Sequence, residues 1–256
     1  MKYYEKFVDL GCFSHDDIEA MTGNRESAHS IIEFYKKKKL IESIRRDLYV
    51  AISLETKQPV ASRFVIASSI TSDAYVSYHS AFEYHGLANQ VYYEVYVSTT
   101  NRFREFEHDG IIYRYFTSPF EDGVVSNNDG VRVTDLERTV IDGINDSDKI
   151  GGLEELLRCI EIIPFLDSDK LIIYLQKYDK EILYQKVGYI LEHYKNELKL
   201  TDAFFKLCEK KVPKTNRFLY ANIKNETRIL SKKWSLYVPI DLLSLTRKGA
   251  LVNEWL

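Results

Sequence analysis

Carboxylates cluster in one short stretch of the chain, TDLERTVID, where Asp135, Glu137 and Asp142 fall close together. Grouped carboxylates can hold Mg²⁺ for nuclease or nucleotidyl-transfer chemistry. The spacing also suits structural roles, because Thr134 and Glu137 stand as in a capping box and Arg138 precedes Asp142 by one helical turn. We interpret the stretch as structural and keep a Mg²⁺-dependent nucleic-acid-modifying enzyme as an alternative.

Two Asp-x-Asp pairs, Asp146/Asp148 and Asp167/Asp169, offer a second set of carboxylates. No phosphate-gripping loop precedes either pair, and both come just before helical patterns, so we expect them to serve as helix caps. His79 and His85 are six residues apart, which does not suit two ligands on one helical face. The sequence contains no Walker loop, Gly-x-Ser-x-Gly or Cys-x-x-Cys motif. We therefore predict no enzymatic activity, no cofactor and no metal.

The composition is that of a globular protein. Of the 256 residues, 45% are hydrophobic, enough to build a sizeable core. No long apolar run or signal peptide is present, so we expect a cytoplasmic protein without membrane contact. The three cysteines are widely spaced and odd in number, which argues against a disulfide framework.

Basic side chains are concentrated near the N-terminus. Residues 24–47 contain seven basic and four acidic side chains, a net charge of +3, whereas the remainder has 28 basic against 34 acidic, or −6. An acidic protein with one basic island suits local docking on a polyanion.

The first fifty residues follow a recognisable order of elements. Helical spacing of apolar residues ends at Gly11, Ser14 and Asn24 can each cap a further helix, and the Thr22-Gly23 turn separates those two helices. Residues 40–44 and 48–52 resemble two strands joined by a basic turn. Three helices followed by a basic hairpin predict a winged helix-turn-helix, whose third helix fits the major groove of double-stranded DNA.

Ala28, Ile31, Ile32 and Tyr35 form the expected buried stripe of the third helix, so the opposite face would meet DNA. A small helical module for protein contact, with the lysines as a solvated helix end, is the alternative. The candidate DNA-contacting residues are Ser14, Asn24, Arg25, Ser27, Ser30, Lys36, Lys37, Lys38, Arg45 and Arg46.

The rest of the chain predicts a larger domain. A polar connector at residues 53–59 suggests a winged-helix domain at 1–53 and a second domain at 60–256. The overall class is α+β, and the second domain would combine a small antiparallel-type sheet, with a hairpin turn at His108-Asp109-Gly110, and a C-terminal helical bundle. Tyrosines in the sheet could line a ligand pocket, which leaves a ligand-sensing repressor as a further alternative. These tyrosines are Tyr92, Tyr93, Tyr96, Tyr113 and Tyr115.

Three blocks, together with the winged-helix start, resemble the AbiEi family of bacterial abortive-infection antitoxins. VSYHSAFEYHGL (residues 76–87) is similar to the family pattern S-x-x-S-A-L-x-x-H-G-L, with Phe82 in place of Leu. VRVTDLERTVID (131–142) is similar to V-x-D-x-E-R-x-x-x-D, with Thr134 inserted before Asp135. KVGYILE (186–192) is similar to R-x-G-Y-L-L-E, with Lys186 in place of Arg. The likeness extends to about residue 220 and is less clear beyond Asn222.

The resemblance implies two functions. The N-terminal domain would bind inverted repeats upstream of its own operon and repress transcription. The second domain would neutralise a co-encoded nucleotidyltransferase-like toxin, as in type IV toxin–antitoxin systems, where the two proteins need not form a stable complex. The matching residues are those that cap, end or pack helices, so we interpret the blocks as marks of a fold and assign no catalytic residue to them.

Overall fold

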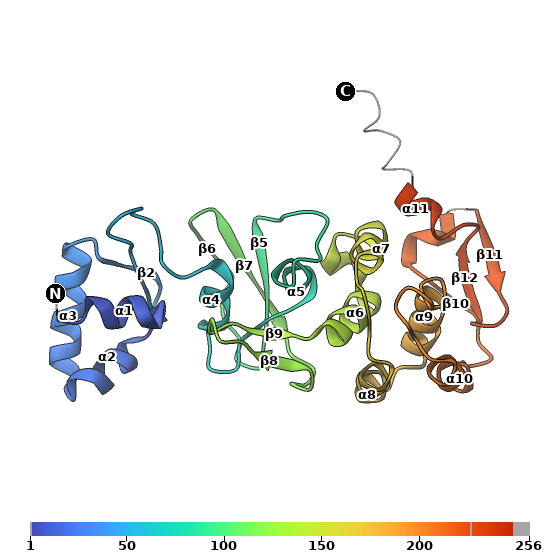
Figure 1. The fold of residues 1–256 in the computed structure, drawn as a ribbon, viewed down its shortest axis with the longest axis horizontal. Coiled ribbons are helices and arrows are strands. Elements are labelled where there is room, and N and C mark those ends of the chain that lie inside the picture. Colours follow the sequence, from blue (N-terminus) through green and yellow to red (C-terminus); the bar gives the residue numbers. More distant parts are fainter. Residues whose placement is uncertain (1, 226, 248–256) are drawn as a thin grey trace, which may run out of the picture. The chain divides into compact units, whose positions relative to one another are not determined.

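The structure is a computed structural model that describes residues 2–225 and 227–247 (Figure 1). Helices and strands both contribute widely, which confirms the predicted α+β class. The chain divides into two compact units. Unit 1 comprises the residues up to Ser77, Tyr92–Ser118 and Val124–Val133, and unit 2 comprises Tyr78–Val91, Pro119–Gly123 and the residues from Thr134 on.

The first part of unit 1, residues 2–52, is called the N-terminal module below. It contains three helices (Figure 1) and a small antiparallel sheet. The strand order of this sheet is β1-β3-β2. The strand β1 was not predicted, because two residues are too few to give a periodic pattern. In chain order the elements are α1 (Tyr4–Leu10), β1 (Cys12–Phe13), α2 (His15–Thr22), α3 (Arg25–Lys37), β2 (Ile41–Arg45) and β3 (Leu48–Ala51).

The N-terminal module has a hydrophobic cluster of its own. Phe7 stacks on Phe13 with ring centroids 4.6 Å apart and meets Tyr35 edge-on at 5.0 Å. The other buried residues of this cluster, from Ile18 to Ala51, also belong to the N-terminal module. The predicted domain boundary at 53–59 stays a prediction. Unit 1 contains both the N-terminal module and a central sheet, so the residues of the predicted second domain are divided between the two units.

The central sheet of unit 1 has six strands in the order β6-β7-β5-β4-β9-β8, with the helix α4 (Arg63–Ser68) preceding them in the chain. The hairpin at Asp109-Gly110 is present between β6 and β7. The antiparallel prediction is correct only in part, because the sheet is mixed: β4 pairs with β5 and β6 with β7 in antiparallel fashion, whereas β5 pairs with β7 and β4 with β9 in parallel. Hydrophobic alternation identifies strands but not their neighbours. The strands are β4 (Tyr75–Val76), β5 (Glu94–Thr99), β6 (Phe106–His108), β7 (Ile111–Thr117), β8 (Val124–Ser126) and β9 (Arg132–Thr134).

Unit 2 is mainly helical, as predicted, and adds a small sheet of order β10-β12-β11. Its helices are α5 (Tyr78–Tyr84), α6 (Leu136–Asn145), the 3₁₀ helix η1 (Ser147–Ile150), α7 (Leu153–Glu161), α8 (Ser168–Tyr178), α9 (Glu181–Glu192), α10 (Asp202–Lys210), the 3₁₀ helix η2 (Ala221–Asn225) and α11 (Ser244–Arg247). Its strands are β10 (Arg217–Phe218), β11 (Arg228–Ser231) and β12 (Leu236–Pro239).

The three cysteines, Cys12, Cys159 and Cys208, are buried and free. Burial raises the pKa of each thiol to about 12, which keeps all three protonated at neutral pH. Across the described residues, every helix is too short or too polar to cross a bilayer.

Candidate nucleic-acid interface

The turn between α2 and α3 is fixed by local hydrogen bonds. Ser14 begins α2 with a capping box: its hydroxyl accepts from the backbone N–H of Asp17, whose carboxylate accepts from the backbone N–H of Ser14 at 2.7 Å. Gly23 ends α2 with φ of 69°, a left-handed conformation that favours glycine. Asn24 then starts α3 by accepting a hydrogen bond from the backbone N–H of Ser27 at 3.0 Å. Both predicted caps are confirmed.

The inner face of α3 is anchored in the core of the module. Ala28, Ile32 and Tyr35 are buried and Ile31 is half-buried, as the predicted stripe requires. The hydroxyl of Tyr35 also accepts a hydrogen bond from the backbone N–H of Tyr3 at 3.1 Å. These contacts fix the rotation of the helix about its axis, and therefore decide which residues face outward.

The outer face of α3 carries exposed polar side chains together with both basic and acidic ones. Every predicted contact on this helix is exposed, namely Arg25, Ser27, Ser30, Lys36 and Lys37, and so are Asn24 before it and Lys38 after it. Asn24, Ser27 and Ser30 line one shallow hollow beside Thr22 and Glu26. The hydroxyl of Ser30 donates to the carbonyl of Glu26 at 3.0 Å, so its oxygen retains the capacity to accept.

The lysines continue this surface beyond the helix. Lys36 forms an exposed ion pair with Glu33 at 3.2 Å, which offsets one acidic charge of the outer face. Lys36 and Lys39 line a second hollow together with Lys57, which lies in the predicted connector. Sequence patterns did not single out Lys57, because its proximity to α3 depends on the path of the chain after β3.

The turn of the β2–β3 hairpin is tied to the start of α2. The carboxylate of Asp47 accepts a hydrogen bond from the backbone N–H of His15 at 2.9 Å. Arg46, on the same turn, is exposed. Ser14, Arg46 and Asp47 line one hollow with the loop after α4. The hairpin tip and the first residues of α2 therefore share a surface.

Arg45 is placed differently from Arg46. Its guanidinium lies 5.6 Å from the ring centroids of both Phe103 and Phe106, and burial lowers its pKa from the ordinary value. Three residues earlier on β2, the carboxylate of Glu42 lies 3.2 Å from the Nε2 of His108. Arg45 thus packs the hairpin against the central sheet, a placement that does not favour its predicted contact with phosphate. Nothing in the sequence near Arg45 signals partners so distant along the chain.

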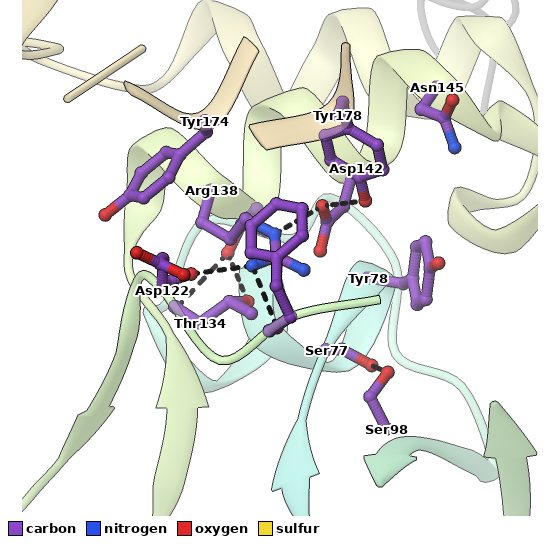
Figure 2. Close-up of polar contacts among 12 residues, drawn as sticks. Ser77, Tyr78, Ser98, Asp122, Thr134, Arg138, Asp142, Asn145, Tyr174 and Tyr178 are labelled. Atoms are coloured by element: carbon purple, nitrogen blue, oxygen red, sulfur yellow. Dashed lines mark hydrogen bonds and ion pairs between the residues drawn. The ribbon is translucent and has the colours of Figure 1, made fainter. Parts of the chain in front are cut away.

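The carboxylates considered for metal chemistry are engaged by protein donors in unit 2. Asp142 is buried and accepts from the Nε of Arg138 at 2.7 Å and from the hydroxyl of Tyr178 at 2.6 Å (Figure 2). Arg138 is also fully buried, donates to the carbonyl of Asp122 at 2.6 Å, and lies 3.7 Å from the centroid of the Phe120 ring. The predicted helical ion pair is confirmed, and burial raises the pKa of Asp142 from its ordinary value.

The capping box expected at Thr134 and Glu137 was wrong. Asp135 caps α6 instead, accepting from the backbone N–H of Arg138 at 2.9 Å, and its other oxygen accepts from the hydroxyl of Tyr174 at 2.7 Å. Glu137 accepts from the backbone N–H of Asp167 at 2.8 Å. Thr134 lies one position too early for this role, because it is the last residue of β9.

The prediction that the Asp-x-Asp pairs serve as helix caps is confirmed for Asp167 and wrong for Asp146. Asp167 caps α8 by accepting from the backbone N–H groups of Asp169 and Lys170. Asp146 makes no capping hydrogen bond to η1 and pairs with Lys149 at 3.2 Å. In the described part of the chain, the group whose ligand atoms come within 4.8 Å of one another is His15, Asp16 and Glu19, at the start of α2. Carboxylates are favoured there by the helix dipole without any ion.

The residues of the AbiEi-like blocks hold unit 2 together. The imidazole Nε2 of His85 contacts the carbonyl oxygen of Thr134 at 2.8 Å. Gly188 lets the ring of Trp234 lie directly against α9, and Glu192 accepts from the indole N–H of Trp234 at 2.8 Å. These contacts give His85, Gly188 and Glu192 packing and hydrogen-bonding roles within unit 2.

Three of the five tyrosines proposed to line a ligand pocket pack on other rings, whereas Tyr93 is largely exposed. Tyr113 stacks on Phe106 with centroids 4.8 Å apart, Tyr115 meets Phe103 edge-on at 5.4 Å, and Tyr96 lies 5.3 Å from Phe116. Aromatic pairs of this geometry stabilise a sheet without a ligand.

Comparison with known proteins finds a solved structure with a similar fold. No protein-family model matches the chain, and no curated protein matches its sequence. Among solved structures, the chain is similar to the Rv2827c protein from Mycobacterium tuberculosis, with a TM-score of 0.60. The two chains share a fold. The likeness covers 98% of this chain and 95% of that chain at 11% identity, so it extends over both units and says nothing further of function.

Proposed function

We propose that the N-terminal module is a winged helix-turn-helix, and that the protein is a cytoplasmic DNA-binding autorepressor and antitoxin of the AbiEi type. The observation that carries the DNA-binding part is the outer face of α3. Its inner stripe is locked into the core, so Ser27, Ser30 and Lys37 face solvent together. A helix of this kind fits the major groove, with polar side chains at base edges.

The β2–β3 hairpin takes the place of the wing. Its turn presents the exposed Arg46 beside the start of α2, and a basic side chain there suits phosphate. Glu26 and Glu33 also lie on the outer face of α3. Glu33 is paired with Lys36, which reduces the repulsion that phosphate would meet. Inverted repeats upstream of its own operon are the proposed target.

DNA binding is tested by titrating the full chain into duplex DNA from upstream of its own gene and into a random duplex of equal length. We expect affinity for the upstream duplex to exceed that for the random one by roughly 10³-fold or more. The double variant Lys37→Ala/Arg46→Ala should weaken binding to both duplexes and reduce the slope of log affinity against log salt by about two. The variant Lys206→Ala/Lys210→Ala, on exposed positions of α10, is the matched control. Equal affinity of the wild-type chain for both duplexes would refute the repressor function.

The antitoxin part is supported by the three AbiEi-like blocks. It is tested by sequencing the genes beside its own and expressing the chain in a bacterial host together with the nucleotidyltransferase-like gene that the proposal requires there. We expect the chain to restore growth, and the Lys37→Ala/Arg46→Ala variant to do so equally when both genes are under an independent promoter, because neutralisation would be separate from repression. Persistent toxicity in the presence of the folded, expressed chain would contradict the proposal.

A further inference from the structure

The loop between β5 and β6, residues 100–105, presents two arginines that the DNA-binding proposal does not use. Arg102 and Arg104 flank Phe103 in the sequence and are both exposed, whereas Phe103 is buried. The ring of Phe103 meets Tyr115 edge-on at 5.4 Å and so anchors the middle of the loop to β7.

Both ends of this loop are held by hydrogen bonds within unit 1. At the start, Asp73 accepts from the backbone N–H of Thr100 at 2.7 Å and from the side-chain amide of Asn101 at 2.8 Å. At the end, the carboxylate of Glu105 accepts from Arg114 at 2.9 Å and from the backbone N–H of Tyr115 at 3.3 Å. The loop is therefore a positioned element, and its arginines are displayed from a fixed backbone.

The loop lies beside the β2–β3 hairpin. The guanidinium of Arg45 is 5.6 Å from the ring of Phe103, the residue between the two exposed arginines. The pair of Glu42 and His108 joins the same two parts of unit 1 at 3.2 Å. The loop that carries Arg102 and Arg104 therefore lies next to the hairpin that carries Arg46.

The charge of the loop is positive. Glu105, its acidic residue, is paired with Arg114, which also binds Glu94 at 2.7 Å. Within the described residues, Arg102 and Arg104 make no ion pair. They line an open hollow with Phe103, Glu105 and Tyr115. Two solvated guanidinium groups carried on a positioned backbone form the kind of surface that binds phosphate oxygens.

We propose that the β5–β6 loop is a second DNA-contacting segment, in which Arg102 and Arg104 bind backbone phosphates of the duplex that α3 engages. This inference rests on the proposed DNA binding and extends the interface from the N-terminal module onto the central sheet. Arg45 then has a distinct role: its packing on Phe103 aligns the hairpin with the loop. Because phosphate contacts carry no sequence information, the loop contributes affinity and orientation, not specificity.

The test uses the full chain with the upstream and random duplexes. The double variant Arg102→Ala/Arg104→Ala should lower affinity for both by about 10-fold or more at moderate salt and reduce the salt slope by about two. The variant Lys214→Ala/Arg217→Ala removes two exposed cations from unit 2 and should leave affinity and slope unchanged. Both arginines are exposed, so circular dichroism and the melting temperature of the loop variant should match those of the wild type.

The possible results separate the inference from the function on which it rests. If the loop variant binds like the wild type while Lys37→Ala/Arg46→Ala binds weakly, the loop is not an interface and the DNA-binding module stands. If loop and control variants lose affinity equally, the effect is one of net charge and the inference is overturned. If the wild-type chain binds neither duplex, the proposed function fails and the inference fails with it.

Discussion

Replacing Asp142 by alanine is expected to lower the free energy of unfolding by about 3–5 kcal/mol, because it leaves a buried charge without its partner. Arg138 is fully buried, and the backbone carbonyl of Asp122 and the faces of Phe120 and Tyr178 cannot neutralise its charge. The hydroxyl of Tyr178 would also lose its acceptor. Denaturant titration followed by circular dichroism measures the change.

An exposed pair with the same spacing provides the control. Arg158 and Glu154 are also one helical turn apart and 3.0 Å from each other, but the side chain of Glu154 is 55% exposed. Glu154→Ala should therefore change stability by no more than roughly 0.5 kcal/mol. Similar losses for Asp142→Ala and Glu154→Ala would show that burial does not set the strength of the first pair. A loss of function by Asp142→Ala is not a sign of catalysis unless the variant is shown to be folded.

Replacing Gly188 by alanine is expected to destabilise unit 2 by about 1–3 kcal/mol through overpacking. A Cβ at this position would lie 2.1 Å from Cζ3 and 2.3 Å from Cη2 of Trp234. The indole cannot easily move, because it is 1% exposed and its N–H is bonded to Glu192 at 2.8 Å. Thermal unfolding of the purified variant measures the effect.

A double-mutant cycle isolates this contact. In a Trp234→Ala background the ring is absent, so Gly188→Ala should stabilise the protein by up to about 1 kcal/mol, as expected for alanine replacing glycine within a helix. The sign of the effect should therefore reverse between the two backgrounds. Destabilisation of equal size in both would mean that Trp234 is not the reason for glycine at this position.

The sequence predicts those parts of the N-terminal module that depend on local chemistry. The caps at Ser14 and Asn24, the glycine between α2 and α3, and the buried stripe of α3 each involve residues within a few positions of one another. Hydrogen bonds over such distances depend on the local sequence alone, so residue types and spacing are enough to anticipate them.

The features that were missed depend on distant residues. Arg45 meets Phe103 and Phe106, from which two helices and three strands separate it in the chain, and its neighbour Arg46 has the same residue type but a different environment. The parallel pairing of β5 with β7 could not be predicted either, because an alternating hydrophobic pattern identifies a strand but not the strand it pairs with. At the start of α6, Thr134 belongs to the end of β9 and Asp135 is the capping residue, a difference that the capping-box spacing did not reveal.

The central claim is that the outer face of α3 and the residues following it contact DNA. Chemical modification of lysines, quantified by mass spectrometry with and without the upstream duplex, tests this claim most directly. We expect Lys36, Lys37 and Lys39 to be protected when DNA is bound, and Lys206 and Lys210 on α10 to react equally in both states. If DNA is bound while the lysines of α3 remain fully reactive, the duplex lies elsewhere on the protein and the proposed interface is wrong.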